Sequence, residues 1–120
     1  MTPTRIALAN IRVPSTPDES VALATTAIRD AGRAGVDVVC FPECFVPGYR
    51  WPDVAAPLPD AVFLEHAWAA VAVAARNAQV GVVLGTERVT DRGLMISALV
   101  IDADGTRLGW QDKVDRKSVV

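Results

Sequence analysis

A short apolar strand that runs directly into a proline-containing loop is the feature that most constrains the fold of this chain. Residues 36–41 (VDVVCF) are rich in β-branched and apolar side chains, which is typical of a strand covered on both faces. Pro42 cannot donate a ladder hydrogen bond, so it is expected to end the strand. Glu43 is therefore predicted to lie just past the carboxyl end of a strand, where open α/β sheets usually bind ligands.

The loop that follows this strand, residues 43–52, is stiffened by prolines and carries two aromatic side chains, Tyr49 and Trp51. A carboxylate at a strand end beside an apolar loop is placed to act as a general base, which makes Glu43 a candidate catalytic residue. Tyr49 is a candidate substrate-binding residue in the wall of the same loop. The alternative for Glu43 is a solvated loop glutamate with no chemical role.

Composition and charge favour one domain and leave small neutral substrates open. The 120 residues are 51% hydrophobic with a net charge of −2, enough for a single core, and without a basic stripe we expect neither nucleic acid nor a membrane as a partner. The longest uncharged stretch in the helical region, residues 67–75, is far shorter than the roughly 20 residues that span a bilayer. No apolar leader precedes the first strand, so we expect a cytoplasmic protein.

The first part of the chain predicts a strand, a helix and a second strand. Residues 5–11 form an apolar run suited to a buried strand. Thr16 is expected to cap the helix that follows, with Glu19 reaching back to the amide of Thr16. Gly32 and Gly35 are expected to end it.

The crossover from the first strand to residues 36–41 makes these two strands parallel. Asn10 and Glu43 should therefore emerge at the same edge of the sheet. The remaining predicted elements are a helix and three strands, at residues 62–77, 79–89, 94–101 and 106–114. Within them, Gly81 and Gly85 are expected to mark a tight approach or a bulge. The order of elements is an α/β layered pattern.

Other motifs are read as structural rather than functional. The glycine-containing segments 32–35 and 81–85 lack the strand–loop–helix context of a phosphate loop, so no nucleotide cofactor is expected. Cys40 and Cys44 have no second ligand pair, so we predict no metal site, and no disulfide is expected because Cys40 lies inside a strand. His66 is expected to have a packing or surface role.

Glu43 and Lys113 are the most informative pair of charged residues. They are far apart in the sequence, yet both fall at the ends of predicted strands of one sheet, so they can converge. A carboxylate and an ammonium in one site suit base catalysis and oxyanion stabilisation. A structural ion pair at a sheet edge fits the spacing equally well. Glu87 is a weaker second carboxylate candidate.

The segment FPECFVPGY, together with the strand and capped helix before it, resembles the N-terminal half of the nitrilase superfamily, the carbon-nitrogen hydrolases. Three later motifs follow in that family's order and spacing: LGTE at 84–87, DADG at 102–105 and GWQDK at 109–113. The likeness covers residues 5–114. It implies an α/β fold that is the N-terminal half of a four-layer αββα sandwich, with one mixed sheet and two helices.

The resemblance also implies a Glu-Lys-Cys triad, in which Glu43 is the general base and Lys113 stabilises the tetrahedral oxyanion. A cysteine thiolate attacks a small-molecule amide or nitrile, ammonia or an amine leaves, and water hydrolyses the thioester. The full-length parent is expected to be a homo-oligomer. The alternative is a non-catalytic α/β binding or interaction module in which Glu43 and Lys113 form a structural ion pair.

The family's cysteine nucleophile follows the lysine by a few tens of residues, whereas this sequence ends soon after Lys113. Cys40 is expected to be buried, and the side chain of Cys44 is expected to diverge from Glu43, so neither replaces it. We interpret residues 1–114 as a partial carbon-nitrogen hydrolase domain, inactive as written, whose exposed apolar sheet face favours aggregation or dimerisation. Residues 115–120 (DRKSVV) match the translation of a common sequencing adapter, which indicates a non-native tail.

Overall fold

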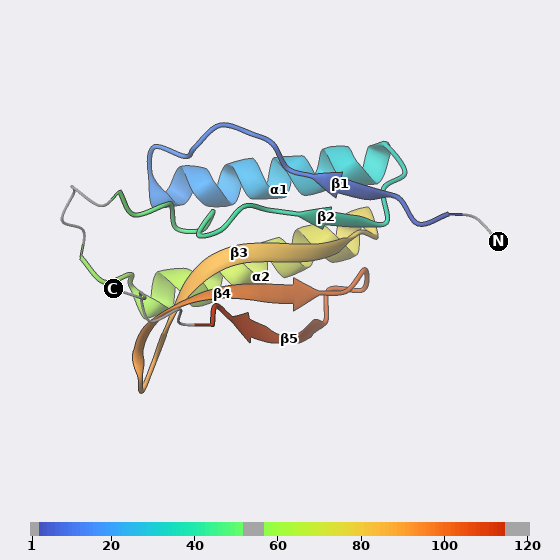
Figure 1. The fold of residues 1–120 in the computed structure, drawn as a ribbon. Helices are drawn as coiled ribbons and strands as arrows, with labels where there is room; N and C mark the ends of the chain where they lie inside the picture. Colours follow the sequence, from blue (N-terminus) through green and yellow to red (C-terminus); the bar gives the residue numbers. More distant parts are fainter. Residues whose placement is uncertain (1–2, 52–56, 115–120) are drawn as a thin grey trace.

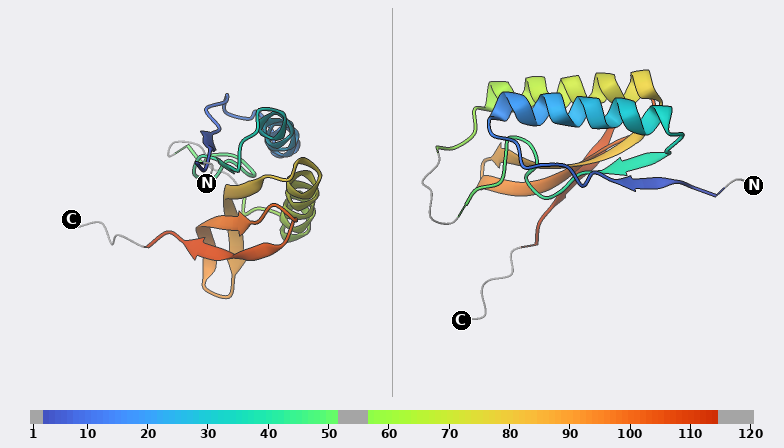
Figure 2. Two further views of the ribbon diagram at one scale, coloured as in Figure 1. Left: turned by 90° about the vertical axis from the view of Figure 1, so that its right-hand side faces the viewer. Right: turned by 90° about the horizontal axis from the view of Figure 1, so that it is seen from above.

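Five strands form one mixed sheet, and two helices pack against one of its faces (Figures 1 and 2). This computed structural model describes residues 3–51 and 57–114; Pro52 and the predicted tail at 115–120 lie outside the described residues. The elements are β1 (Ile6–Leu8), α1 (Pro17–Arg33), β2 (Val38–Cys40), α2 (Ala61–Ala78), β3 (Gly81–Thr90), β4 (Gly93–Ile101) and β5 (Arg107–Asp112). They adjoin in chain order, with β1, β2 and β3 parallel and β3, β4 and β5 antiparallel.

Helix α1 begins with a side-chain cap, as the sequence predicts. The hydroxyl of Thr16 accepts a hydrogen bond from the amide of Glu19 at 3.1 Å, and Pro17 occupies the first turn. The expected return bond from Glu19 to the amide of Thr16 is wrong. The Glu19 carboxylate instead accepts from the amide of Ser15 at 2.7 Å and forms an ion pair with Arg12. The ion pair with Arg12 explains why the Glu19 carboxylate binds the amide of Ser15 instead of that of Thr16.

The two helices approach each other closely at a glycine. Gly35, with φ of +73°, follows the end of α1, but Gly32 lies inside the helix rather than ending it. A Cβ atom on Gly32 would lie 2.9 Å from the Cβ of Ala78, so this glycine and the alanine-rich face of α2 allow the contact. Neither helix in the described ranges is long and apolar enough to cross a bilayer.

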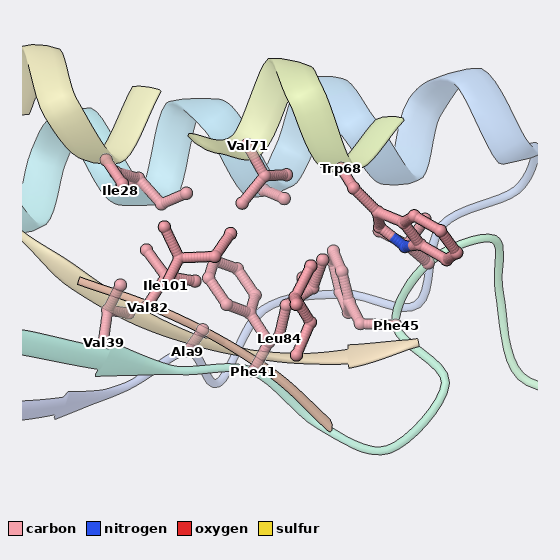
Figure 3. Close-up of a cluster of buried hydrophobic side chains, with 14 of the residues drawn as sticks. Ala9, Ile28, Val39, Phe41, Phe45, Trp68, Val71, Val82, Leu84 and Ile101 are labelled. Atoms are coloured by element: carbon pink, nitrogen blue, oxygen red, sulfur yellow. The ribbon is translucent and has the colours of Figure 1, made fainter. Parts of the chain in front are cut away.

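The core lies between the helix layer and the sheet (Figure 3). Alternate residues of a strand point to the same face, so β3 and β4 each direct a row of apolar side chains at the helices. Val82 and Leu84 from β3 and Leu99 and Ile101 from β4 are each no more than 1% exposed. They pack with helix residues such as Ile28 and Val71.

The face of the sheet opposite the helices carries a second apolar row. Strand register aligns Leu8, Cys40, Val83 and Val100 across four strands, and none of these side chains is fully buried. Leu8 is 77% exposed. The prediction of a buried strand over residues 5–11 is therefore wrong on both counts. The strand is limited to Ile6–Leu8, and the described helices cover only one of its faces.

Candidate active site

The chain leaves β2 by crossing a glycine of the neighbouring strand. The amide of Phe41 donates to the carbonyl of Val83 at 2.9 Å, and the ladder stops at Pro42, as predicted. A Cβ atom on Gly85 would lie 1.9 Å from the carbonyl oxygen of Pro42, so only glycine permits this path. The predicted tight approach is confirmed at Gly85. At Gly81 the nearest atom would lie at 3.5 Å, an ordinary contact.

The loop after Glu43 is fastened along β3 by its backbone. The amide of Val46 donates to the carbonyl of Gly85 at 3.2 Å, and the amide of Glu87 donates to the carbonyl of Val46 at 3.0 Å. Phe45 points into the core, where its ring lies 5.4 Å from that of Phe41 (Figure 3). These contacts fix the position of Glu43 relative to β3, although Glu43 itself stands in a turn.

Lys113 directly follows β5, the edge strand of the sheet, and contacts Glu43, which follows β2. Its amide continues the β4–β5 ladder by donating to the carbonyl of Ile96 at 2.7 Å, and its ammonium donates to Oε1 of Glu43 at 2.8 Å. The hydrogen bond and the negative charge of Glu43 raise the pKa of Lys113. The two side chains are 58% and 42% exposed. The structure thus brings together the two residues whose convergence the strand ends predicted.

Cys44 adjoins Glu43 in sequence but faces a different environment. It is 3% exposed, and its backbone takes the left-handed conformation, with φ of +52°. Burial, followed by the negative charges of Glu87 and Glu43, raises the pKa of the Cys44 thiol to about 11. A thiol protonated at neutral pH is a poor nucleophile. This supports the expectation that Cys44 does not supply the attacking sulfur.

Tyr49 lines a pocket that is separate from the ion pair. Its ring packs edge-on against Trp51 with the ring centroids 5.3 Å apart. A pocket of about 680 Å³ is lined by this loop, by Phe63 of α2 and by the segment that leads into α1. Glu43 and Lys113 do not line that pocket. The substrate-binding role of Tyr49 therefore stays a prediction.

Glu87 does not join Glu43 and forms a buried ion pair of its own. Its side chain is 1% exposed, and both carboxylate oxygens accept hydrogen bonds from the guanidinium of Arg50. Nη2 of Arg50 also donates to the carbonyl of Pro57 at 2.7 Å. Sequence reasoning missed Arg50; a single cation within an otherwise proline- and aromatic-rich loop was the available signal.

A second missed cluster precedes Lys113. Both oxygens of Asp112 accept from Nη2 of Arg88 at 2.9 Å, and the hydroxyl of Ser97 donates to Oδ1 at 2.5 Å. The hydrogen bond from Ser97, followed by that from Arg88, lowers the pKa of Asp112. The guanidinium of Arg88 stacks 4.8 Å from the ring of Trp110. The only hint of this cluster in the sequence was Asp112, the acidic residue directly before Lys113.

Two other residues singled out in the sequence lie on the surface. His66 is exposed on α2, in agreement with a surface role. Asn10 is exposed beyond β1, and the amide of the preceding Ala9 donates to the carbonyl of Cys40 at 2.8 Å. The ends of β1 and β2 therefore meet at one edge of the sheet, as the parallel crossover predicted.

The family model for carbon-nitrogen hydrolases matches residues 5–119. The chain therefore belongs to the carbon-nitrogen hydrolase family. A nitrilase from Penicillium rubens is 50% identical over 38 residues, which cover 31% of this chain and 12% of that protein.

Solved structures of the nitrilase superfamily share this fold. The NitN amidase from Nesterenkonia sp. AN1 superposes with a TM-score of 0.79 at 25% identity, over 94% of this chain and 45% of that chain. A carbon-nitrogen hydrolase from Helicobacter pylori G27 gives a TM-score of 0.73 at 15% identity, over 93% of this chain and 40% of that chain, which shows the fold alone. The chain thus spans less than half the length of these neighbours, and its mixed sheet with two helices corresponds to part of their fold.

Proposed function

We propose that Glu43 is the general base and Lys113 the oxyanion-stabilising group of a hydrolase that cleaves carbon-nitrogen bonds of small amides or nitriles. The observation that carries this proposal is the 2.8 Å hydrogen bond from the Lys113 ammonium to Glu43, both within residues 5–119, which the carbon-nitrogen hydrolase family model matches. An ammonium next to a carboxylate supplies a positive charge for a developing oxyanion and an acceptor for a proton in one site.

With an amide, the proposed reaction has two halves. Glu43 takes the proton of a cysteine thiol supplied from outside these 120 residues, and the sulfur attacks the amide carbon while Lys113 stabilises the tetrahedral oxyanion. Glu43 then gives the proton to the nitrogen, the carbon-nitrogen bond breaks, and ammonia or an amine leaves a thioester. Water attacks the thioester, Glu43 takes a proton from the water, and that proton returns to the departing sulfur. The chain by itself is proposed to be inactive.

An aliphatic amide is the substrate that we propose to test first. A cysteine-to-alanine mutant of the Nesterenkonia sp. AN1 amidase has been solved in complex with butyramide, and that chain is 25% identical to this one with a TM-score of 0.78, over 93% of this chain and 43% of that chain. The uncharged butyramide suits a site in which the base and the lysine already neutralise each other.

A non-catalytic binding module is the second candidate function. The specific observation in its favour is the exposure of Lys113 and Glu43, at 58% and 42%, which is also what a surface ion pair shows. In that case the protein hydrolyses no amide or nitrile, and the pair only stabilises the fold.

We propose a cytoplasmic location from the state of the two cysteines. Cys40 and Cys44 are both free, which fits a reducing, cytoplasmic compartment. We propose that the full-length enzyme is a homo-oligomer.

The proposed function is tested by ammonia release from butyramide. The reading frame is extended past codon 114 from its source DNA, and the full-length protein is assayed beside its Glu43→Gln and Lys113→Met variants. We expect kcat to fall about 10²- to 10⁴-fold without the base and about 10²- to 10³-fold without the lysine. Arg107→Gln, which removes an exposed ion pair with Glu65 on the helix-covered face, is the matched control and should retain activity.

Two results would contradict the proposal. One is a full-length protein whose hydrolysis of butyramide, other amides and nitriles survives the Glu43→Gln change. The other is hydrolysis by purified 1–120 protein that disappears in Glu43→Ala, because the chain would then need no outside cysteine.

A further inference from the structure

Two neighbouring residues of β3, Glu87 and Arg88, each contact one half of the candidate site. Successive residues of a strand point to opposite faces of the sheet. Glu87 accordingly faces the loop that carries Glu43, whereas Arg88 lies on the helix-covered face, where it stacks on Trp110. The ring of Trp110 packs in turn against that of Trp68 from α2, with centroids 4.7 Å apart.

Glu87 fastens the far end of the loop that begins at Glu43. Its amide donates to the carbonyl of Val46 at 3.0 Å, and its buried carboxylate holds the guanidinium of Arg50 through both oxygens. The near end of the loop is fixed where the carbonyl of Pro42 lies against Gly85. Both ends of the segment that presents Glu43 are therefore attached to β3 within a few residues of each other.

Arg88 fastens the end of β5 that presents Lys113. It donates to both oxygens of Asp112 at 2.9 Å, and Ser97 of β4 holds the same carboxylate. Because Asp112 is fixed on the helix-covered face, the next residue, Lys113, is directed to the opposite face, where Glu43 stands. The hydrogen-bond geometry of a paired guanidinium and carboxylate is specific, so the direction of the strand end is well defined.

The strand register connects the two attachments. Ile96 of β4 lies opposite Glu87, and its carbonyl accepts the amide of Lys113 at 2.7 Å. Glu87, Ile96 and Lys113 thus form one row across three strands. The backbone pairing in this row therefore helps to determine the distance between the Glu43 loop and Lys113, in addition to the exposed ion pair between them.

We propose that Glu87 and Arg88 are positioning residues, which hold the Glu43 loop and the Lys113 strand end at the spacing that brings the base and the ammonium into contact. The positioning is a property of the fold; its importance for catalysis rests on the proposed function. Neither residue touches the reacting atoms in this account.

The test measures the pKa of Lys113 in the chain itself, in the wild type and in the Arg88→Gln and Arg50→Gln variants. Lys113 and Lys117 are the two lysines of the sequence, so competitive acetylation with acetic anhydride across pH, read by peptide mass spectrometry, resolves each of them. In the wild type the pKa of Lys113 should lie above 10.5, and Glu43→Gln should remove this elevation. Both arginine variants should lose the elevation as Glu43→Gln does, because the pair is no longer aligned.

The sign of the shift separates positioning from simple electrostatics. Removal of a nearby positive charge by itself raises the pKa of a lysine, whereas loss of contact with Glu43 lowers it. Arg107→Gln is the matched control: it also removes a cation from an ion pair on this sheet, with Glu65, and should leave the pKa of Lys113 at the wild-type value. Circular dichroism establishes that each variant is folded. If either glutamine variant fails to fold, the corresponding lysine variant, Arg50→Lys or Arg88→Lys, takes its place. It keeps the charge but loses the paired geometry, and the pKa of Lys113 is measured in it in the same way.

The proposal is overturned if the folded arginine variants retain the wild-type pKa of Lys113, or if Arg107→Gln lowers it equally. It is also overturned if Glu43→Gln leaves that pKa unchanged, because the contact would then not exist in solution. These outcomes are distinguishable from failure of the proposed function. If the chain passes this test but the full-length protein hydrolyses no amide or nitrile, the positioning role of Glu87 and Arg88 stands. Only the proposed enzymatic function then fails.

Discussion

At the scale of single residues, the sharp turn after β2 gives Glu43 and Cys44 opposite surroundings. Glu43 is 42% exposed and meets Lys113, while Cys44 is 3% exposed with a thiol pKa of about 11. Of the two side chains, only Glu43 is open to a group that approaches from outside these residues. Gly85 makes this turn possible, because a side chain there would occupy the place of the Pro42 carbonyl.

Replacement of Gly85 by alanine tests this dependence. A Cβ atom 1.9 Å from a backbone oxygen forces the Pro42–Glu43 backbone to move, so we expect a loss of about 1–3 kcal/mol in the free energy of unfolding. Chemical denaturation measures the loss. Gly81→Ala in the same strand is the control, because its nearest contact would be 3.5 Å away. Equal stability of the two variants would contradict the account.

Sequence alone predicted that Glu43 and Lys113 can converge, because Pro42 marked the end of one strand and Lys113 falls at the end of another; the contact between them bears this out. Their catalytic roles were implied by the family resemblance and stay predictions. Arg50 and Arg88 were not predicted, because the partner of a long flexible cation depends on the path of a loop or on strand register. The sequence shows neither.

At the scale of elements, the start of α1 shows how a local rule is modified by a neighbour. Thr16 caps the helix as its spacing predicts, yet Glu19 turns to Ser15 and to Arg12, which comes from the preceding loop. A capping pattern specifies where the helix begins. It does not specify where the glutamate goes when a cation lies within reach.

This cap predicts a pH dependence of stability in the acid range. The hydrogen bond from Arg12, followed by that from the Ser15 amide, lowers the pKa of Glu19 from 4.5 to about 2. A carboxylate with a depressed pKa stabilises the fold above the unfolded value, so its contribution should be lost as the pH falls from about 4.5 to about 2. Urea unfolding at several pH values should show a smaller decline over this range in Glu19→Gln than in the wild type. An identical decline in both proteins would refute the prediction.

The predicted helices were close to those observed because their caps and periodicity are local signals. The first strand was predicted too long and too buried. An apolar run indicates that both faces avoid water, but in the described structure helices cover only the face of Ala7, and Ile6 and Leu8 remain 63% and 77% exposed. Burial of a strand depends on what packs over it, which is a property of the whole fold.

At the scale of the whole molecule, the two-layer arrangement leaves the sheet face opposite the helices with an apolar row, Leu8, Cys40, Val83 and Val100. Glu43, which follows β2, and Lys113, which follows β5, meet on this same face. Contiguous exposed apolar surface favours association between molecules. The domain boundary at residue 114 and the assignment of residues 115–120 as a tail stay predictions.

We predict that the purified chain associates with itself through this face. Sedimentation at rising protein concentration should show dimers or larger species, and Leu8→Lys should shift the distribution towards monomer because a charge then stands in the row. Val73→Lys is the control, since Val73 is an exposed apolar residue on the helix layer, 47% exposed. A wild-type chain that stays monomeric throughout would contradict the prediction.

The most direct test of the central claim is to read the source DNA past codon 114. The account, in which Glu43 and Lys113 are two members of a triad, predicts a reading frame that continues without the adapter-like codons 115–120 and encodes a cysteine on a predicted strand some tens of residues later. A genomic sequence that contains those six codons followed directly by a stop would contradict the account. It would leave Glu43 and Lys113 as a structural ion pair in a binding module.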